Sequence, residues 1–271
     1  MVWYSLNVEE SKEIRIKEAS IAEFSSVATR SEFEEIAERG FWESEKILIE
    51  KYFKPNTSIL DLGCGSGRTT IPLYRAGYRI IGVDITPEMI EAALSVSKAK
   101  NLKIDYRIGD ATQLDFGDNI FDGAIFANNG WAQIPGKDNR QKALNETYRV
   151  LKSGGIFIFT SHERYISRKT FMFWLREWAR YHLLIHFGMK TEGIDYGDIF
   201  FKRKHDKTQK QFIHMAGAGE VKEQVGRAGF TLVLEQKMGD IAKSDAQAMR
   251  GSLNKSFDSH KSPVFYVCKK P

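Results

Sequence analysis

The chain has 271 residues, of which 42% are hydrophobic and 28% are charged, and its net charge is +5. These values are typical of a globular protein, and the length suffices for one sizeable α/β domain with an insertion. Two cysteines, Cys64 and Cys268, exclude a disulfide framework and offer no metal-ligand spacing, so we expect a reducing, cytoplasmic setting and no bound metal. The N-terminal residues lack a signal-peptide pattern, and charged residues interrupt the most apolar stretch, Phe171–Phe187, so no membrane span is expected.

Helices are expected over residues 1–54, before the first strand. Glu9–Thr29 is charged with scattered apolar positions, and Ser31 is followed by acidic residues as an N-cap would be. Phe41–Phe53 places large apolar side chains at helical spacing, which predicts a helix packed on one face of a sheet.

Residues Ser58–Gly67 combine a short apolar strand with a glycine-rich turn. The apolar residues around Leu60 are those expected of a central parallel strand. Glycines then stand at alternate positions, where the backbone must approach a ligand closely or adopt positive φ. The next residues, Arg68–Ala76, predict a helix that ends at Gly77, so the sequence indicates a ligand cradle at a helix N-terminus.

Strands and helices then alternate, which predicts βαβ units and a parallel sheet. The expected strands are Arg79–Val83, Leu102–Ile108, Phe121–Ala127, Ile156–Ser161, Phe230–Glu235 and Val264–Cys268. The expected helices are Pro87–Lys98, Lys137–Leu151 and Glu220–Ala228. Polar residues follow several of the strand ends, and the carboxyl ends of parallel strands are where open α/β sheets bind ligands.

Residues 162–215 interrupt this alternation. Tyr165–Phe187 predicts an aromatic-rich helix, and Asp198–Lys204 with Gln209–Met215 predicts a hairpin. Residues 162–214 contain 11 Lys and Arg against 6 Asp and Glu, an excess equal to that of the whole chain. This charge would suit an anionic acceptor or a nucleic acid, but a solvated basic face is the favoured interpretation. The apolar stripe of the helix indicates a lid or a dimer surface.

The spacing of Asp61, Gly63, Gly65 and Gly67 resembles the first motif of class I S-adenosylmethionine-dependent methyltransferases, an acidic residue followed by three alternate glycines. The resemblance covers about residues 55–160 and, more loosely, the last two strands. It implies a Rossmann-like α/β fold: a seven-stranded, mostly parallel sheet with helices on both faces and an antiparallel last strand.

The resemblance also divides the chain into three parts. Residues 55–161 and 216–271 are expected to form the core that binds S-adenosylmethionine. Residues 1–54 are expected to cover the cofactor, as N-terminal helices often do in this family. Residues 162–215 are expected to be an inserted helix and hairpin that act as a lid over the acceptor.

Several residues at strand ends are expected to hold the cofactor. Asp84 ends the second strand about twenty residues after the glycine turn, where a carboxylate accepts hydrogen bonds from both ribose hydroxyls. In the family, the aspartate at the position of Asp110 receives the adenine amino group, and the loop at Asn128 holds the methionine part. The complete set that the resemblance implies is Asp61, Gly63, Cys64, Gly65, Gly67, Asp84, Ile85, Met89, Gly109, Asp110, Ala111, Asn128, Asn129 and Trp131.

Two histidines are candidates for a general base. His162 follows the fifth strand and His214 ends the hairpin, and a neutral imidazole at either place could take a proton from a hydroxyl or ammonium nucleophile. A structural hydrogen-bonding role is the alternative for each histidine. Trp131 has two interpretations as well, a cation–π contact with the sulfonium or an aromatic acceptor, or a place in the core.

We therefore expect a methyltransferase that moves a methyl group from S-adenosyl-L-methionine to a nitrogen or oxygen of a small molecule, with S-adenosyl-L-homocysteine as the product. An anionic or aromatic acceptor is expected, and a monomer and a homodimer both remain open. The alternatives are an RNA methyltransferase that uses the basic insertion, and a cofactor-binding regulatory protein without turnover. Asp61 and the glycine spacing disfavour a nicotinamide oxidoreductase, and the absence of prolines after Asn128 disfavours methylation of the amino groups of DNA bases.

Overall fold

The computed structural model describes the backbone of residues 2–183, 192–202, 210–245 and 263–271, with side chains from residue 12 onward. Its helices are α1 (Val2–Ser25), α2 (Val27–Arg39), α3 (Glu43–Tyr52), α4 (Thr70–Arg75), α5 (Pro87–Ala99), η1 (Trp131–Gln133, a 3₁₀ turn), α6 (Lys137–Val150), α7 (Phe171–His182), α8 (Glu220–Arg227) and α9 (Met238–Ile241). Its strands are β1 (Ser58–Leu62), β2 (Arg79–Asp84), β3 (Asp105–Ile108), β4 (Phe121–Phe126), β5 (Leu151–Glu163), β6 (Asp198–Lys202), β7 (Lys210–Ala216), β8 (Thr231–Lys237) and β9 (Val264–Lys269).

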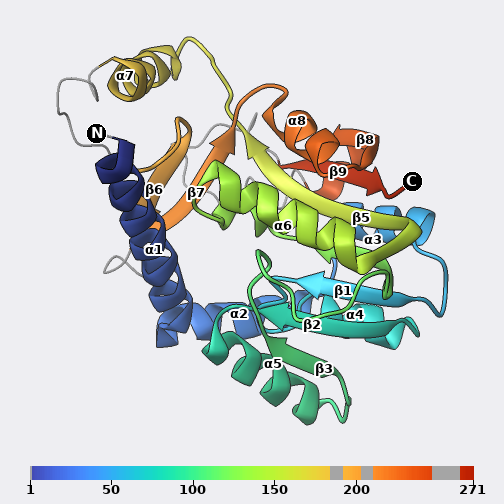
Figure 1. The fold of residues 1–271 in the computed structure, drawn as a ribbon. Coiled ribbons are helices and arrows are strands. Elements are labelled where there is room, and N and C mark those ends of the chain that lie inside the picture. Colours follow the sequence, from blue (N-terminus) through green and yellow to red (C-terminus); the bar gives the residue numbers. More distant parts are fainter. Residues whose placement is uncertain (1, 184–191, 203–209, 246–262) are drawn as a thin grey trace.

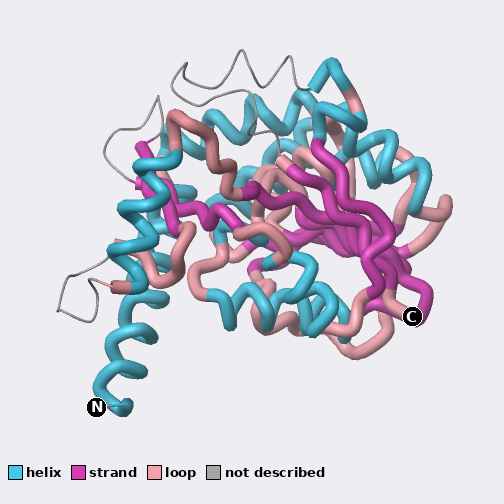
Figure 2. Tube along the Cα trace, turned by 90° about the horizontal axis from the view of Figure 1, so that it is seen from above, coloured by secondary structure: helices cyan, strands magenta, loops and turns pink. Residues whose placement is uncertain are grey.

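The central sheet has the strand order β3-β2-β1-β4-β5-β9-β8. Strands β1 to β5 are parallel, and β9 is antiparallel to both of its neighbours. Helices cover both faces of this sheet (Figure 2). The predicted Rossmann-like fold, with a mostly parallel sheet and an antiparallel last strand, is therefore confirmed.

Alternate residues of the central strands enter two separate apolar cores, as the period of two in a strand requires. On β1, Leu60 and Leu62 pack in the core that contains Leu144 of α6. Ile59 packs instead in the core that contains residues of α3, α4 and α5. Asp61 has the same parity as Ile59 and is 0% exposed, so its side chain points to the α3 side of the sheet.

Two of the differences between the predicted and observed element boundaries have a clear local cause. The N-cap of α2 is Ser26, whose Oγ accepts a hydrogen bond from the Thr29 N–H at 3.2 Å, whereas Ser31 lies inside that helix. The third strand begins at Asp105 rather than at Leu102, because the Leu102 N–H donates to the Ser97 carbonyl and closes α5.

The insertion extends one end of the sheet. The last residues of β5 pair with β7, and β6 pairs with β7 as an antiparallel hairpin, as predicted. The expected hairpin tip falls within residues 203–209, and the expected end of the aromatic helix falls within residues 184–191, both outside the described residues. In Figure 1, α7 stands beyond the end of β5 and apart from the sheet, while α1 runs beside β6 and β7.

Two polar contacts fix α3 against the core. The Arg68 guanidinium donates to both carboxylate oxygens of Glu45, at 2.6 and 2.7 Å, and so ties the helix to the residue after the glycine turn. The Asp245 carboxylate accepts from the first N–H groups of α3, those of Glu43 and Ser44. None of the helices in the described part of the chain is both long and apolar enough to cross a membrane.

Candidate cofactor and acceptor site

A cavity of about 340 Å³ lies at the carboxyl ends of β1, β2, β3 and β4. This is the edge where a parallel sheet presents its loops to a ligand. Its wall includes the glycine turn, Asp84 and Asp110 from the sheet, and Asn128 from the loop after β4. The side of α1 that faces the sheet forms a roof with the residues Glu13, Ile14, Lys17, Ser20, Ile21 and Phe24.

The glycine turn brings main chain to the cavity wall. Gly63 and Gly65 both line the cavity and have positive φ, +59° and +53°. A Cβ on Gly65 would lie 3.3 Å from Phe33 Cδ1 of α2, and one on Gly63 would lie 2.7 Å from the ring of Phe126. Only glycine meets both the backbone and the space requirement here, so the turn forms the cradle that the sequence predicts.

Asp84 is positioned by two local hydrogen bonds. Its Oδ2 accepts from the Gly65 N–H and its Oδ1 from the Thr86 N–H, each at 2.9 Å. Burial raises the pKa of Asp84, and these two donors oppose that rise. A carboxylate offers about four acceptor sites. Each carboxylate oxygen of Asp84 can therefore accept a further hydrogen bond. Two hydroxyls of a ribose would require one such acceptor each.

Asp110 shares the cavity with a residue of the roof. Its Oδ1 accepts from the backbone and the hydroxyl of Thr112, each at 2.8 Å, while its Oδ2 lies 2.6 Å from the Nζ of Lys17. Burial alone would raise the pKa of Asp110, but Lys17 and Thr112 hold it below the usual value. Asp110, which is expected to receive the adenine amino group, therefore also holds α1 over the cavity through Lys17.

The loop after β4 holds two successive asparagines in the left-handed region, Asn128 at φ 51° and Asn129 at φ 61°. The Asn129 N–H donates to the Thr160 Oγ1 at 2.7 Å, which keeps this strained loop in place. Asn128 is exposed to the cavity, whereas Asn129 is buried beneath it. Only the first of the pair therefore lines the cavity.

Four more of the predicted cofactor residues also line the cavity: Ile85, Met89, Gly109 and Ala111. Five do not line it: Asn129, and in addition Asp61, Cys64, Gly67 and Trp131. Asp61 points to the α3 side, where its Oδ2 accepts from the hydroxyls of Thr69 and Thr70, each at 2.6 Å. Cys64 is buried in the core on that side, and Gly67 packs against Tyr106 and Ile71.

Side chains of a strand alternate between its two faces, and Asp61 lies on the α3 side of β1. It therefore supports the glycine turn from the side of the sheet that faces away from Leu60 and Leu62. Burial raises its pKa to about 6, and its Oδ1 has no hydrogen-bond partner among the described residues. Asp61 does not line the cavity, in contrast to its place in the predicted cofactor-binding set. The sequence motif does contain its acidic residue, but the side chain of Asp61 binds the hydroxyls of Thr69 and Thr70 at the start of α4.

Trp131 belongs to the core. Its side chain is 0% exposed, its Nε1 donates to the Arg140 carbonyl at 3.1 Å, and its ring packs on Phe159 at 5.6 Å between centroids. The 3₁₀ turn of η1 points it under the loop and away from the cavity. The expected cation–π contact with a sulfonium is therefore wrong, and the alternative interpretation as a core aromatic holds.

Neither candidate base lines the cavity. His162 is half-buried on β5, opposite Met215 of β7. His214 is 0% exposed, with Nδ1 at 2.8 Å from the Asp198 Oδ1 and Nε2 at 3.0 Å from the Glu220 Oε1. Both ring nitrogens of His214 face carboxylate oxygens, so this side chain is committed to the structural role that was the alternative for it.

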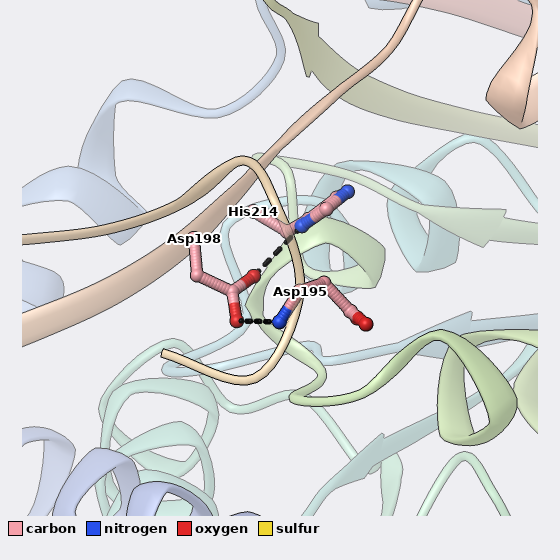
Figure 3. Close-up of side chains that lie close together, drawn as sticks. All are labelled: Asp195, Asp198 and His214. Carbon is pink, nitrogen blue, oxygen red and sulfur yellow. Dashed lines mark hydrogen bonds and ion pairs between the residues drawn. The ribbon is translucent and has the colours of Figure 1, made fainter. Parts of the chain in front are cut away.

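His214 is the centre of a buried group that we call the charge clasp: His214, Asp198, Glu220, Asp195 and Arg140. Figure 3 shows Asp198 between His214 and the Asp195 backbone. Arg140 is 0% exposed and donates to the Asp195 Oδ2 at 2.8 Å. The clasp therefore joins β6 and β7 of the insertion to α6 and α8 of the core.

The carboxylates of Asp198 and Glu220 in the clasp are already bonded to groups of the protein. One ligand atom each from Asp195, Asp198 and His214 lies within 4.8 Å of the others, a spacing that a metal ion could use. The second oxygen of Asp198, however, accepts two backbone N–H groups at 2.7 and 2.8 Å. Burial alone would raise the pKa of Glu220, but the contact with His214 lowers it to about 2, so that carboxylate stays ionised. The pattern is that of an ion-pair network rather than a metal centre.

The roof supplies site residues that the sequence reasoning missed. Glu13 lines the cavity near Gln133, and its Oε2 accepts from the Asn139 amide at 2.9 Å. Burial raises the pKa of Glu13, and the hydrogen bond from Asn139 opposes that rise. Glu13 and Lys17 are one helical turn apart, but nothing in α1 signals which distant loops they meet. No described residue of 162–215 lines the cavity, and its roof is formed by α1.

Comparison with known proteins bears directly on this arrangement. The model of a family described as a methyltransferase domain matches residues 60–159, from β1 to β5. These residues include the glycine turn and Asp84, Asp110 and Asn128 of the cavity wall. Residues 60–159 carry a methyltransferase domain.

Relatives of this methyltransferase domain have several activities. A demethylmenaquinone methyltransferase of Symbiobacterium thermophilum is 34% identical over 142 residues, which cover 49% of this chain and 55% of that protein. A carboxy-S-adenosyl-L-methionine synthase of Campylobacter jejuni is 33% identical over 115 residues, 42% of this chain and 47% of that protein. The matches thus span about half the length of these curated relatives. A solved S-adenosylmethionine-dependent methyltransferase of Methanosarcina mazei shares the fold, with a TM-score of 0.63 at 18% identity over 85% of this chain and 98% of that one.

Proposed function

We propose that this chain moves a methyl group from S-adenosylmethionine to a nitrogen or oxygen nucleophile of a small molecule by direct in-line transfer. The observation that carries the proposal is the roofed cavity, in which the glycine turn, Asp84 and Asp110 face α1. A roof formed by the same chain favours a small acceptor over a folded RNA. The similarity to a demethylmenaquinone methyltransferase, which is named for a quinone acceptor, supports the same class.

The residues of the cavity fit the cofactor. Asp84 has acceptor capacity for the ribose hydroxyls, Asp110 has it for the adenine amino group, and the Gly63–Gly65 turn leaves space for the methionine part. The cofactor brings an activated methyl group, so covalent help from the protein is not needed. The protein must then align the nucleophile and exclude water, and the α1 roof serves both purposes.

We assign proton removal from the acceptor to Glu13. It is a carboxylate that lines the cavity, and a hydrogen bond from Asn139 holds it in place. Its raised pKa moves it toward that of a base that works near neutral pH. A carboxylate here would also attract an acceptor that arrives as an ammonium ion.

Titration calorimetry tests the cofactor part of the proposal. We expect wild-type protein to bind S-adenosylhomocysteine in preference to NAD⁺ or single-stranded RNA. Asp84→Ala should weaken that binding by about 1.5–3 kcal/mol, the worth of hydrogen bonds to a charged group. Asp105→Ala is the matched control, because Asp105 pairs with Arg107 on the surface of β3, outside the cavity. Unchanged affinity in folded Asp84→Ala protein, or preference for NAD⁺, would reject the assignment.

Glu13→Gln tests the acceptor part. In a screen of amines and hydroxyl compounds with radiolabelled cofactor, we expect this variant to lose roughly a hundredfold in kcat, the lower range for general-base catalysis. Its affinity for S-adenosylhomocysteine should stay near wild type, because glutamine keeps the size and the hydrogen bond. Turnover equal to that of the wild type would remove Glu13 from the reaction.

A further inference from the structure

One face of α7 is apolar and faces solvent. Phe171, Leu175 and Trp178 follow one another at helical spacing and are exposed by 50%, 43% and 43%. Met172 and Leu183, exposed by 68% and 50%, widen the same face. We call these five residues the α7 apolar face. Contiguous apolar surface of this kind on a soluble protein marks a place where something else binds.

The opposite side of α7 anchors the helix to the protein. Trp174 is buried, and its Nε1 donates to the Tyr165 carbonyl at 3.2 Å. The Tyr196 hydroxyl in turn donates to the Trp174 carbonyl at 3.2 Å. Arg164 lies over the Tyr196 ring at 4.1 Å. The helix is therefore held by its inner side, and the apolar face is presented outward from a fixed support, apart from the sheet (Figure 1).

Positive charge surrounds this face. Residues 164–183 contain five Lys and Arg and a single acidic residue, Glu177. Glu177 is on the buried side, where Arg176 and Arg180 approach it at 3.3 Å. We call Arg168, Lys169 and Arg176, which are all exposed, the basic rim. A partner must therefore offer both an apolar interior and negative charge at its surface.

A bilayer with anionic headgroups has both properties. A helix with aromatic and aliphatic residues on one side and basic residues beside them lies in the interface of such a bilayer. A second copy of the chain would place the same basic rim against itself, because a twofold interface uses one patch twice. A single-stranded RNA would find phosphate contacts and two rings, Phe171 and Trp178, but the other three residues of the face are aliphatic and give bases no ring to stack on.

We propose that α7 docks this protein on an anionic lipid surface. The α7 apolar face enters the boundary between headgroups and acyl chains, and the basic rim contacts the headgroup phosphates. The docking surface is separate from the cavity, so the proposal does not depend on methyl transfer.

Co-sedimentation with vesicles tests the proposal, using phosphatidylcholine alone and phosphatidylcholine mixed with phosphatidylglycerol. We expect the wild-type chain to bind the mixed vesicles and to be released from them by salt. The double variant Met172→Gln, Leu175→Gln should bind roughly tenfold or more weakly, because apolar burial drives insertion. Arg168→Gln with Lys169→Gln should lose roughly fivefold per charge, and only on the anionic vesicles.

The matched control is Leu94→Gln with Val233→Gln, which removes two aliphatic side chains of similar exposure, 48% and 45%, from other parts of the surface. It should bind as the wild type does. Thermal unfolding of every variant verifies that the fold is retained. The blue shift of tryptophan emission on binding should shrink in Trp178→Phe, because Trp178 lies in the docking face.

Three outcomes would overturn the proposal. One is wild-type protein that stays in the supernatant with anionic vesicles. Another is binding by the Met172→Gln, Leu175→Gln variant that equals the wild type. The third is a concentration-dependent dimer, seen by analytical ultracentrifugation, that the same variant abolishes, since a second copy would then be the occupant.

Discussion

Two groups of buried carboxylates in this protein are used in opposite ways. In the cavity, Asp84 is held by N–H groups of nearby main chain and keeps acceptor capacity toward open space. In the charge clasp, Asp198 accepts from His214 and from two backbone N–H groups, and Glu220 faces His214 and Arg140. The comparison teaches that a carboxylate can serve as a ligand site where its unused acceptor capacity faces a cavity, and as a structural tie where its neighbours take that capacity up.

The largest expected effect on ligand binding is at the cradle of the cavity. Gly65→Val should weaken S-adenosylhomocysteine binding by roughly a hundredfold or more, since it adds a β-branched side chain at positive φ and next to Phe33. Calorimetry measures the loss. Gly154→Val is the control, because Gly154 also has positive φ, +79°, with open space around it. If both variants bind equally well, the turn is not the cofactor cradle.

A substitution in the charge clasp should lower the free energy of unfolding rather than the affinity for a ligand. His214→Ala leaves Asp198 and Glu220 facing each other without the group between them, so we expect a loss of about 3–5 kcal/mol in the free energy of unfolding. Urea denaturation measures it, with His182→Ala on the exposed side of α7 as the control. A stable variant that has lost turnover would instead return His214 to the reaction.

The clasp should also differ from Asp61, the buried carboxylate beneath the glycine turn, in the sign of its pH dependence. The Glu220 pKa of about 2 is below its unfolded value of 4.5, so its stabilisation is present above pH 4.5 and is lost as the pH falls toward 2. The Asp61 pKa of about 6 is above its unfolded value of 3.8, so stability falls as the pH rises from 3.8 to 6. Each effect is on the order of 3 kcal/mol.

Unfolding measured across this pH range checks both signs. Glu220→Gln should remove the acid-side loss, and Asp61→Asn should remove the fall between pH 3.8 and 6. If the free energy of unfolding changed with pH in the same way in the wild type and in both variants, the different roles of Glu220 and Asp61 would be contradicted.

The smallest effect is expected where the roof meets the cavity. Lys17→Met frees the Asp110 Oδ2 for a ligand, so S-adenosylhomocysteine should bind up to about 1 kcal/mol more tightly, the usual limit for a partly exposed ion pair. Lys100→Met, which breaks the pair with Glu38 away from the cavity, is the control. Weaker binding in Lys17→Met would mean that Lys17 serves the cofactor rather than competing with it.

The sequence predicted the cavity well where its contacts are local. Asp84 takes its hydrogen bonds from Thr86, two residues later, and from the glycine turn that the motif already contains. The parallel sheet follows from the alternation of strands and helices in the same way. Such patterns can be predicted from a sequence because a few consecutive residues determine both the chemistry and the backbone conformation.

The sequence could not predict contacts that depend on distant packing. Asp61 fits the motif, but its position in β1 places its side chain on the α3 side of the sheet and not in the cavity wall. Trp131 follows the right loop, yet the η1 turn buries it. The Glu13 carboxylate meets an amide 126 residues away, and His214 and Asp198 meet only after the hairpin has formed. No local pattern distinguishes these outcomes, because each is decided by which surface the element packs on.

The α1 roof also has a kinetic consequence. Polar contacts fasten it: Lys17 to Asp110, Ser25 to Glu88 at 2.7 Å, and Lys12 to the Gly193 carbonyl at 3.1 Å. Residues of α1 line the cavity, so under the proposed function both substrates and both products would have to pass this roof. Because the pace of exchange then depends on breaking these contacts, which dissolved ions weaken, product release would limit turnover and would become faster as ionic strength rises.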